Sequence, residues 1–500
     1  MRLRVLLVLL TLPPLVACPS GGEDDGGFTT FTSTGTTGTT TDDDIGTLDG
    51  GDVDPTDSTE TGTGETGTTD TGDTGEELRP NWHQDVAPLV TSACAGCHTE
   101  GGIAPFSMDG YQQTSPWAAL MADDAEQGLM PPWHAIPSND CAPSLEFKHD
   151  PRLSPEEIQL LRDWADIGAP EGDPNLAVPL PEPPDLDLPN PTTTALMASP
   201  VSVEAQGNTL DFFHCLSLDP GNAEEVYIDG LQVVAGNRSV LHHVLVYIDT
   251  TADSASWPGG VKLDCGGAAG TNAPTELVSA WVPGGLPMEP PAGVGITLPA
   301  GARIILNVHY HATGGGAEID DGTGMALRWT NNKPAYGSLF ELIGAPGEGN
   351  SLNGPLMIPA GETNHVEEYE WTVSYGGQPF PDSIDVRVWA VINHMHKVGV
   401  SAEAWIESAQ DGTSCLLATP KWDFNWQRFY EYDAPVNQAI RVRAGDTIRV
   451  RCTYDNSLNN PGVVEALAEV GLDQPIDVNL GEATLDEMCL TGIAVGVNGL

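Results

Sequence analysis

Two histidines separated by one residue, His394 and His396, lie in a run of β-branched residues. Alternate residues of a β-strand point to the same face, so these two imidazoles can bind one metal ion together. Two ligands make an incomplete site, however, and a pair of half-buried structural histidines gives the same pattern. The assignment therefore depends on whether the chain supplies further ligands.

Other histidines occur in two similar runs of the chain. His242 and His243 are adjacent, and His309 and His311 lie on either side of a tyrosine. Adjacent residues of a regular strand point to opposite faces. His242 and His243 can therefore share an ion only at a twist, a bulge or a strand end.

A different chemistry is indicated by Cys94, Cys97 and His98, which form a C-x-x-C-H sequence. This is the attachment motif of a c-type haem, in which both thiols form thioethers and the histidine binds the iron. A zinc-binding or redox-active C-x-x-C is the alternative.

Three methionines after the C-x-x-C-H motif could supply the sixth iron ligand. Met130 is the expected one, because the prolines at 131 and 132 stiffen its loop. Met108 and Met121 are then core residues. Farther along, Ser154, Pro155 and Glu157 predict a capped helix that closes a small all-α, cytochrome c-like domain over 78–170.

The N-terminal residues predict export. A basic start and a short apolar run over 1–18 end at Cys18 in a sequence that resembles the lipobox of bacterial lipoproteins. An ordinary signal peptide is the alternative. The segment 19–77 has sixteen Asp or Glu residues and no Lys or Arg, which predicts a disordered acidic tether. We therefore expect an envelope protein, lipid-anchored through Cys18 in the outer membrane.

The charge and the remaining patterns set the rest of the organisation. A formal net charge of −52 argues against nucleic-acid binding, which needs a cationic surface. A proline-rich linker is expected over 171–194. From 195 onward, short β-branched runs between Gly, Pro and Asn turns predict two all-β antiparallel sandwiches of jelly-roll type, at 195–347 and 348–500.

The histidine-bearing half of the chain resembles one enzyme family. The resemblance lies in Leu241–Val244, Asn307–Tyr310, His394–Gly399 and Asp486–Cys489, supported by Val278–Trp281 and Lys421–Gln427. In this order, these stretches resemble the copper type II, ascorbate-dependent monooxygenases, the family of peptidylglycine α-hydroxylating and dopamine β-monooxygenases. The likeness covers roughly residue 195 to the C-terminus.

The resemblance implies two copper ions, one in each sandwich, that face each other across a cleft. By this likeness the all-histidine site consists of His242, His243 and His309, and the mixed site consists of His394, His396 and Met488. Three imidazoles suit copper in either oxidation state, whereas a thioether favours Cu(I), the form that binds O2. His311 could be a ligand by its position, but we expect that it is not one.

The resemblance also implies two disulfides, Cys215 with Cys265 and Cys452 with Cys489. Cys141 and Cys415 are left, and they either pair with each other or remain unpaired.

Three positions depart from the pattern of the peptide-processing enzyme. Ile392, Leu490 and Gly492 stand where that enzyme has the Arg, Asn and Tyr that hold a substrate carboxylate. A glycine-extended peptide substrate is therefore not expected, and a more apolar pocket is.

Together these features predict a copper- and O2-dependent monooxygenase that hydroxylates a C–H bond of a small organic substrate. Electrons would come from ascorbate or a protein donor, by way of the fused haem c. The alternative is a non-catalytic haem and copper lipoprotein that stores or transfers copper or electrons. A hydroxylase needs a substrate pocket beside the mixed site, whereas a carrier does not.

Overall fold

The computed structural model describes residues 79–500 except 101, 103, 208, 314, 375–377, 382 and 482–484. The expected signal sequence, Cys18 and the whole acidic tether lie outside the described residues. The fold below belongs to one compact unit, 77–500. None of its described helices is long and apolar enough to cross a membrane.

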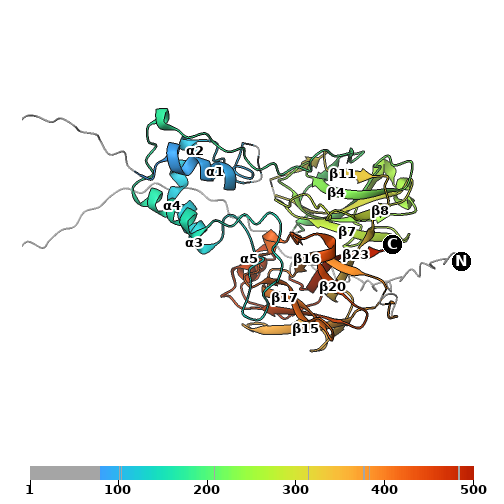
Figure 1. Ribbon diagram of the computed structural model, residues 1–500. Helices are drawn as coiled ribbons and strands as arrows, with labels where there is room; N and C mark the ends of the chain where they lie inside the picture. The colour runs from blue at the N-terminus through green and yellow to red at the C-terminus, as the bar shows by residue number, and fades with distance from the viewer. Residues whose placement is uncertain are drawn as a thin grey trace, which may run out of the picture. The chain divides into compact units, whose positions relative to one another are not determined.

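Short helices around a small core form the first part of the described chain (Figure 1). At its end, the Ser154 hydroxyl accepts a hydrogen bond from the Glu157 N–H, and the Glu157 carboxylate accepts one from the Ser154 N–H. This is the expected capping box, with Pro155 at the first helical position. The helices and helical turns are η1 (Trp82–Val86), α1 (Ala87–Ala93), α2 (Tyr111–Thr114), η2 (Ser115–Trp117), α3 (Ala118–Gln127), α4 (Pro155–Asp166) and η3 (Pro174–Leu176).

The remainder is mostly β-sheet, as expected. Two sheets enclose one apolar core and form the first sandwich. One sheet has the order β6-β3-β9-β5-β7, and the facing strands are β1-β11-β4-β8. The strands are β1 (Thr193–Leu196), β2 (Val201–Val203), β3 (Asp211–Leu218), β4 (Val226–Val234), β5 (Leu241–Asp249), β6 (Val261–Lys262), β7 (Thr275–Trp281), β8 (Val294–Leu298), β9 (Arg303–His311), β10 (Glu318–Asp320) and β11 (Gly324–Thr330). Two short helical turns accompany them, η4 (Asp253–Ser256) and η5 (Pro258–Gly260).

A second sandwich encloses its own core. The sheet β13-β15-β21-β17-β18 faces β12, β23, β16, β19 and β20. The strands are β12 (Tyr336–Ala345), β13 (Asn350–Ser351), β14 (Met357–Ile358), β15 (His365–Thr372), β16 (Val386–His394), β17 (Gly399–Ser408), β18 (Gly412–Thr419), β19 (Tyr430–Glu431), β20 (Ile440–Val442), β21 (Thr447–Tyr454), β22 (Val478–Asn479) and β23 (Cys489–Asn498). The helical elements here are η6 (Phe424–Trp426), η7 (Val436–Gln438) and α5 (Pro461–Glu469).

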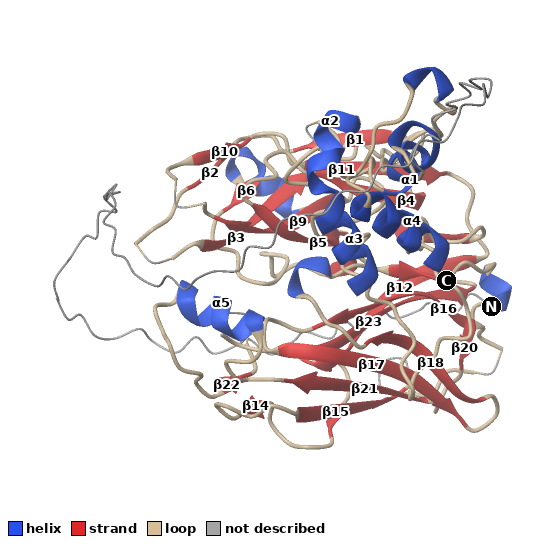
Figure 2. Cartoon of the chain, turned by 90° about the vertical axis from the view of Figure 1, so that its left-hand side faces the viewer, coloured by secondary structure: helices blue, strands red, loops and turns tan. Residues whose placement is uncertain are grey.

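The two sandwiches share a sheet. Strand β12 pairs with β23 along its whole length and touches β8 in parallel through Tyr336 and Gly337, so one nine-stranded sheet runs through both sandwiches. Figure 2 shows β12, β16 and β23 between the first sandwich and the sheet of β15, β17 and β21. Strand β12 precedes the boundary expected at 347–348, yet most of its pairing is with the second sandwich.

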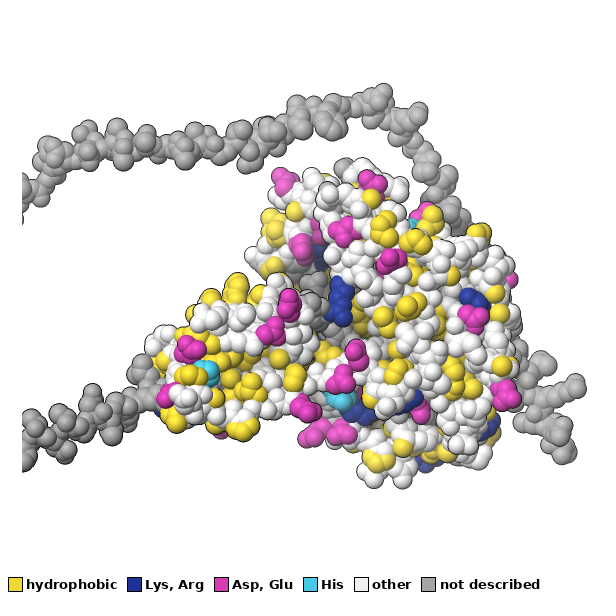
Figure 3. Space-filling model, turned by 90° about the horizontal axis from the view of Figure 1, so that it is seen from above, with side chains coloured by type: hydrophobic (Ala, Val, Ile, Leu, Met, Phe, Trp, Pro, Cys, Tyr) yellow, Lys and Arg dark blue, Asp and Glu magenta, His cyan; other side chains and the backbone are white. Residues whose placement is uncertain are grey.

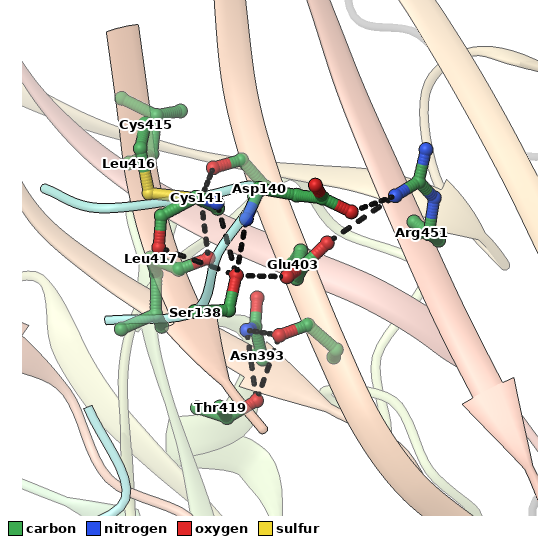
Figure 4. Close-up of a disulfide and its surroundings, with 12 residues drawn as sticks. Ser138, Asp140, Cys141, Asn393, Glu403, Cys415, Leu416, Leu417, Thr419 and Arg451 are labelled. Atoms are coloured by element: carbon green, nitrogen blue, oxygen red, sulfur yellow. Dashed lines mark hydrogen bonds and ion pairs between the residues drawn. A yellow bond between two sulfur atoms is a disulfide. The ribbon is translucent and has the colours of Figure 1, made fainter. Parts of the chain in front are cut away.

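The segment between α3 and α4 is fastened to the second sandwich. A disulfide joins Cys141 to Cys415 of β18 (Figure 4). Next to it, the Ser138 hydroxyl bonds the Glu403 carboxylate, which also pairs with Arg451. This settles the alternatives left open by the sequence: the two cysteines are paired, and they tie the helical segment to the second sandwich.

Candidate metal centre

The all-histidine site is built by two neighbouring strands. Strands β5 and β9 pair so that His243 lies opposite His309, and a register shift between Leu241 and His243 marks a bulge at His242. The bulge brings the adjacent histidines together, as their sequence required. The Nδ1 atom of His243 lies 3.2 Å from the Nδ1 atoms of both His242 and His309. The donor atoms of the three residues lie within 4.8 Å of one another, so they could hold a metal ion.

Asp211 of β3 orients one of these histidines. Its Oδ1 atom accepts hydrogen bonds from His309 Nε2, at 2.8 Å, and from His311 Nδ1, at 2.9 Å. With Nε2 as the donor, Nδ1 of His309 is left with the lone pair that binds a metal. Burial would raise the pKa of Asp211, but the two histidine hydrogen bonds hold it well below its usual range. The bond to Asp211 raises the pKa of His311.

Two histidines of this site, His242 and His243, are held in the neutral form. Burial lowers the pKa of His242 to about 3, and burial also lowers the pKa of His243 well below its usual value. Since metals bind neutral imidazole, the donor set suits copper.

The mixed site lies at the end of β16. His394 Nδ1 donates to the side-chain oxygen of Gln427, and His396 Nδ1 donates to the backbone carbonyl of Asp486, at 3.0 Å. With Nδ1 as the donor, the lone pair of each ring is on Nε2, and the ring centroids are 5.2 Å apart. Burial lowers the pKa of His394, which keeps it neutral. Met488 lines the same cavity as both histidines.

The buried carboxylate of Glu487 contacts both chain segments that supply the mixed site, the one with His396 and the one with Met488. Glu487 accepts backbone hydrogen bonds from His396 and Met488 on one oxygen and from Val398 and Gly399 on the other, at 2.7–3.2 Å. It has no solvent-exposed surface, and burial raises its pKa to about 8. Met395, between the two histidines, points away into the core of the second sandwich, as expected.

Both sites line one cavity of about 610 Å³ between the sandwiches. Phe424 lies between them: its ring centroid is 5.4 Å from that of His242 and 5.9 Å from that of His396. The cavity walls combine residues from β3, β5, β7 and β9 with residues from β12, β16 and β23. The structure therefore brings together every histidine and methionine that the sequence assigned to the two sites.

Four residues that shape these sites were not singled out individually from the sequence: Asp211, Phe424, Gln427 and Glu487. Phe424 and Gln427 belong to a stretch that resembled the family, and Glu487 precedes Met488, so their positions carried a signal. Asp211 carried none, because its role depends on the pairing of β3 with the distant strand β9.

The C-x-x-C-H motif follows α1 in the helical segment. Cys94 and Cys97 are free thiols, and burial raises the pKa of Cys94 to about 12. His98 Nδ1 donates to the Phe106 carbonyl at 3.1 Å, which leaves Nε2 available. Met108 and Met121 are core residues, as expected, whereas Met130 is 37% exposed. Two unpaired cysteines and an oriented histidine fit a covalent haem.

Exposed apolar residues accompany the motif. Large apolar side chains of the helical segment that face solvent include Trp117, Leu120, Leu129 and Met130. Figure 3 shows hydrophobic side chains gathered on this part of the surface.

Disulfides brace both sandwiches. Cys215 is bonded to Cys265, and Cys452 is bonded to Cys489, the two pairs that the family resemblance implied. Because Cys489 follows Met488 directly, the second bond anchors that methionine to β21.

The similarity of the chain to two solved structures is weak. Two solved structures of infectious bursal disease virus, one of the Gt strain and one of its VP2 subviral particle, are each 10% identical to the chain. They cover 63% and 62% of it, and 75% and 82% of their own lengths, with TM-scores of 0.12 and 0.10, which are too low to indicate a shared fold.

Residues 354–469 match the family model described as copper type II ascorbate-dependent monooxygenase, C-terminal domain. The match includes His394, His396, Phe424, Gln427 and α5, and it ends before Met488. It supports the family indicated by the resemblance, and with it an oxidoreductase that depends on copper and ascorbate.

Proposed function

We propose that the protein is a monooxygenase that hydroxylates a C–H bond. In this reaction R–H, O2, two electrons and two protons yield R–OH and water. The observation that supports it most is the shared cavity, onto which both candidate sites open. A protein that only stores or transfers copper needs no such cavity, so the cavity favours the monooxygenase over the carrier.

The proposed ligands are His242, His243 and His309 for one copper ion and His394, His396 and Met488 for the other. Copper bound there would supply the electron transfer and O2 reduction that the hydroxylation requires. The chain's own contribution is to keep His242, His243 and His394 neutral, to fix tautomers through Asp211, Gln427 and the Asp486 carbonyl, and to surround the mixed site with apolar walls.

We also propose that Cys94, Cys97, His98 and Met130 would hold a covalent haem c, which would supply one-electron transfer to the copper sites. The motif lies near Arg428 of the second sandwich: burial raises the pKa of Cys97, and the charge of Arg428 acts in the opposite direction. Arg428 lies over the Trp133 ring, at 5.3 Å, and is adjacent to Gln427, which holds His394. Ascorbate or a protein donor would reduce the haem.

The proposed location is the cell envelope, with Cys18 lipidated and inserted in the outer membrane. This rests on the sequence alone: residues 1–18 indicate lipidation, and Pro19, which is not the aspartate that retains lipoproteins in the inner membrane, favours the outer membrane.

The proposed function is tested on the purified full-length protein. Two copper ions per chain by elemental analysis and one haem by its pyridine haemochrome spectrum are expected. After reduction, O2 uptake should rise when a panel of C–H donors is added, and ¹⁸O from ¹⁸O2 should appear in a hydroxylated product. The monooxygenase is refuted if loaded, reduced protein takes up no O2 with any donor.

A further inference from the structure

The cavity also indicates the class of substrate, an inference that rests on the proposed function. Its floor is the outer face of β12, β23 and β16. In this sheet Leu342 lies opposite Gly492, which lies opposite Ile392. In the next row, Leu490 lies directly opposite His394. Directly opposite residues on neighbouring strands lie close together. Leu342, Ile392 and Leu490 therefore form a continuous apolar floor beside the mixed site.

The facing wall is apolar as well. On β5, Leu245 and Tyr247 follow His243 on the same face of the strand, because alternate residues share a face. Their partners on β7 are Ala280 and Leu277. A substrate that reaches the mixed site thus lies between two apolar surfaces.

The charged groups that line the cavity are paired with one another. Asp211 bonds His309 and His311, and Lys397 pairs with Glu469, at 2.7 Å, and with Glu465, at 3.3 Å. Among the described lining residues, Lys397 is the only ammonium or guanidinium group, and two glutamates share it. A substrate carboxylate or ammonium group would have to displace one member of this cluster or lie against the apolar walls without a side chain of opposite charge, which is costly.

We propose that the substrate is an uncharged, largely apolar molecule that binds against Leu342, Gly492 and Ile392 beside the mixed site. The volume of about 610 Å³ lies within the range of ordinary small-molecule sites. Gly492 sets the depth of the floor. A Cβ atom there would overlap the Phe340 ring and lie 2.8 Å from Ile392 Cγ2, so any larger residue would displace Phe340 or Ile392, both of which line the cavity.

The test compares three probes with one carbon skeleton: butylbenzene, 4-phenylbutanoate and 4-phenylbutylammonium. Each is titrated calorimetrically into full-length holo-protein without O2, so that no turnover occurs. The Kd for butylbenzene should be at least about tenfold lower than for either charged probe, corresponding to about 1.4 kcal/mol. Equal or tighter binding of a charged probe, or no saturable binding of butylbenzene, overturns the proposal.

Two variants locate the binding surface. Gly492→Ala changes the floor, and Leu245→Asn changes the opposite wall. Each should weaken butylbenzene binding by about fivefold or more. If Gly492→Ala does not fold, Leu245→Asn alone tests the binding surface. The matched control is Leu263→Asn, at a site that is 61% exposed and outside the cavity. Wild-type affinity in both cavity variants shows that the probe binds elsewhere and refutes the proposal.

Failure of this inference can be told apart from failure of the proposed function. Anaerobic binding of butylbenzene with no O2 uptake by any donor after aeration would retain an apolar ligand and reject the monooxygenase. Oxygenation that is faster with 4-phenylbutanoate than with butylbenzene would retain the monooxygenase and reject the apolar substrate.

Discussion

The two candidate copper sites differ in how the fold holds them. The all-histidine site is fixed by strand register: His243 and His309 face each other on paired strands, and a bulge adds His242. The mixed site begins at the last residue of β16 and is completed by Met488, just before β23. The ladder between β16 and β23 reaches only as far as His394, opposite Leu490. His396 and Met488 lie beyond it and are held by Glu487 and a disulfide, and Gln427 orients His394.

This difference suggests different sensitivities. A site built on neighbouring strands keeps its geometry as long as the sheet is intact. A site whose ligands lie beyond the ends of the strands depends on the side chains that hold those ligands in place. We therefore expect single substitutions to damage the mixed site more than the all-histidine site.

The largest effect is expected for Met488→Leu. The change removes the proposed thioether ligand but keeps an apolar side chain of similar volume. Substrate-dependent O2 uptake should fall by at least about 100-fold, and the sulfur contribution to the copper X-ray absorption spectrum should disappear. Haem and all-histidine copper should remain.

Met395→Leu is the matched control, because Met395 lies between the two histidines but points into the core. It should retain activity and the copper–sulfur signal. Activity in Met488→Leu, or an equal loss in Met395→Leu, would contradict the ligand assignment.

The second prediction compares the two sandwich disulfides. They close loops of similar length, with sequence separations of 50 for Cys215–Cys265 and 37 for Cys452–Cys489, so removing either should destabilise the protein by about 4 kcal/mol. Only the second bond adjoins a proposed ligand. Replacing Cys452 and Cys489 by Ala should therefore also lower copper affinity at the mixed site, whereas replacing Cys215 and Cys265 should not.

Denaturant unfolding and copper titration separate these two effects. Equal copper loss in both double variants would show that general destabilisation, and not the position of Met488, explains the change.

The contrast between the sites also explains what the sequence could predict. Short-range patterns were sufficient for the strands, for the capped helix at Pro155, and for the bulge that adjacent His242 and His243 require. The resemblance, rather than the spacing, supplied Met488 as a partner of His394.

Contacts between distant segments could not be derived from local patterns. The pairing of β12 with β23 is one example. Gly344 adopts a φ of +121° there, and a Cβ atom would overlap the Cys489 carbonyl, yet in the sequence Gly344 resembles part of a loop between domains. Glu487 is another example, because an acidic residue beside Asp486 normally indicates a solvated turn. Its carboxylate accepts hydrogen bonds from four backbone N–H groups that the fold brings to it.

The third prediction concerns this carboxylate. Glu487→Gln preserves shape, but the amide nitrogen cannot accept the hydrogen bonds that one carboxylate oxygen now receives. Two buried N–H groups lose their acceptor, which should cost about 2–4 kcal/mol of folding free energy and weaken copper binding at the mixed site by roughly tenfold. Thermal unfolding and copper titration measure the two effects. Unchanged copper affinity would mean that Met488 and His396 are positioned without it.

The smallest effect is expected at the equivalent support of the all-histidine site. Asp211→Asn keeps an oxygen that can accept from both His309 Nε2 and His311 Nδ1, so copper affinity should fall by only a few-fold. Asp211→Ala removes the acceptor and should reduce affinity by about tenfold. In both variants the strand register still presents three Nδ1 atoms, so two copper ions should bind at saturation.

His311→Gln is the companion to these variants, since His311 shares Asp211 with His309 but is not expected to bind copper. Two copper ions per chain and an unchanged imidazole count by pulsed EPR of the Cu(II) form should result. Loss of one imidazole from that spectrum would make His311 a ligand, and the all-histidine site would then depend on more than the pairing of β5 with β9. A loss of copper in Asp211→Asn as large as that in Glu487→Gln would likewise remove the proposed difference between a site set by strand register and one held by side chains.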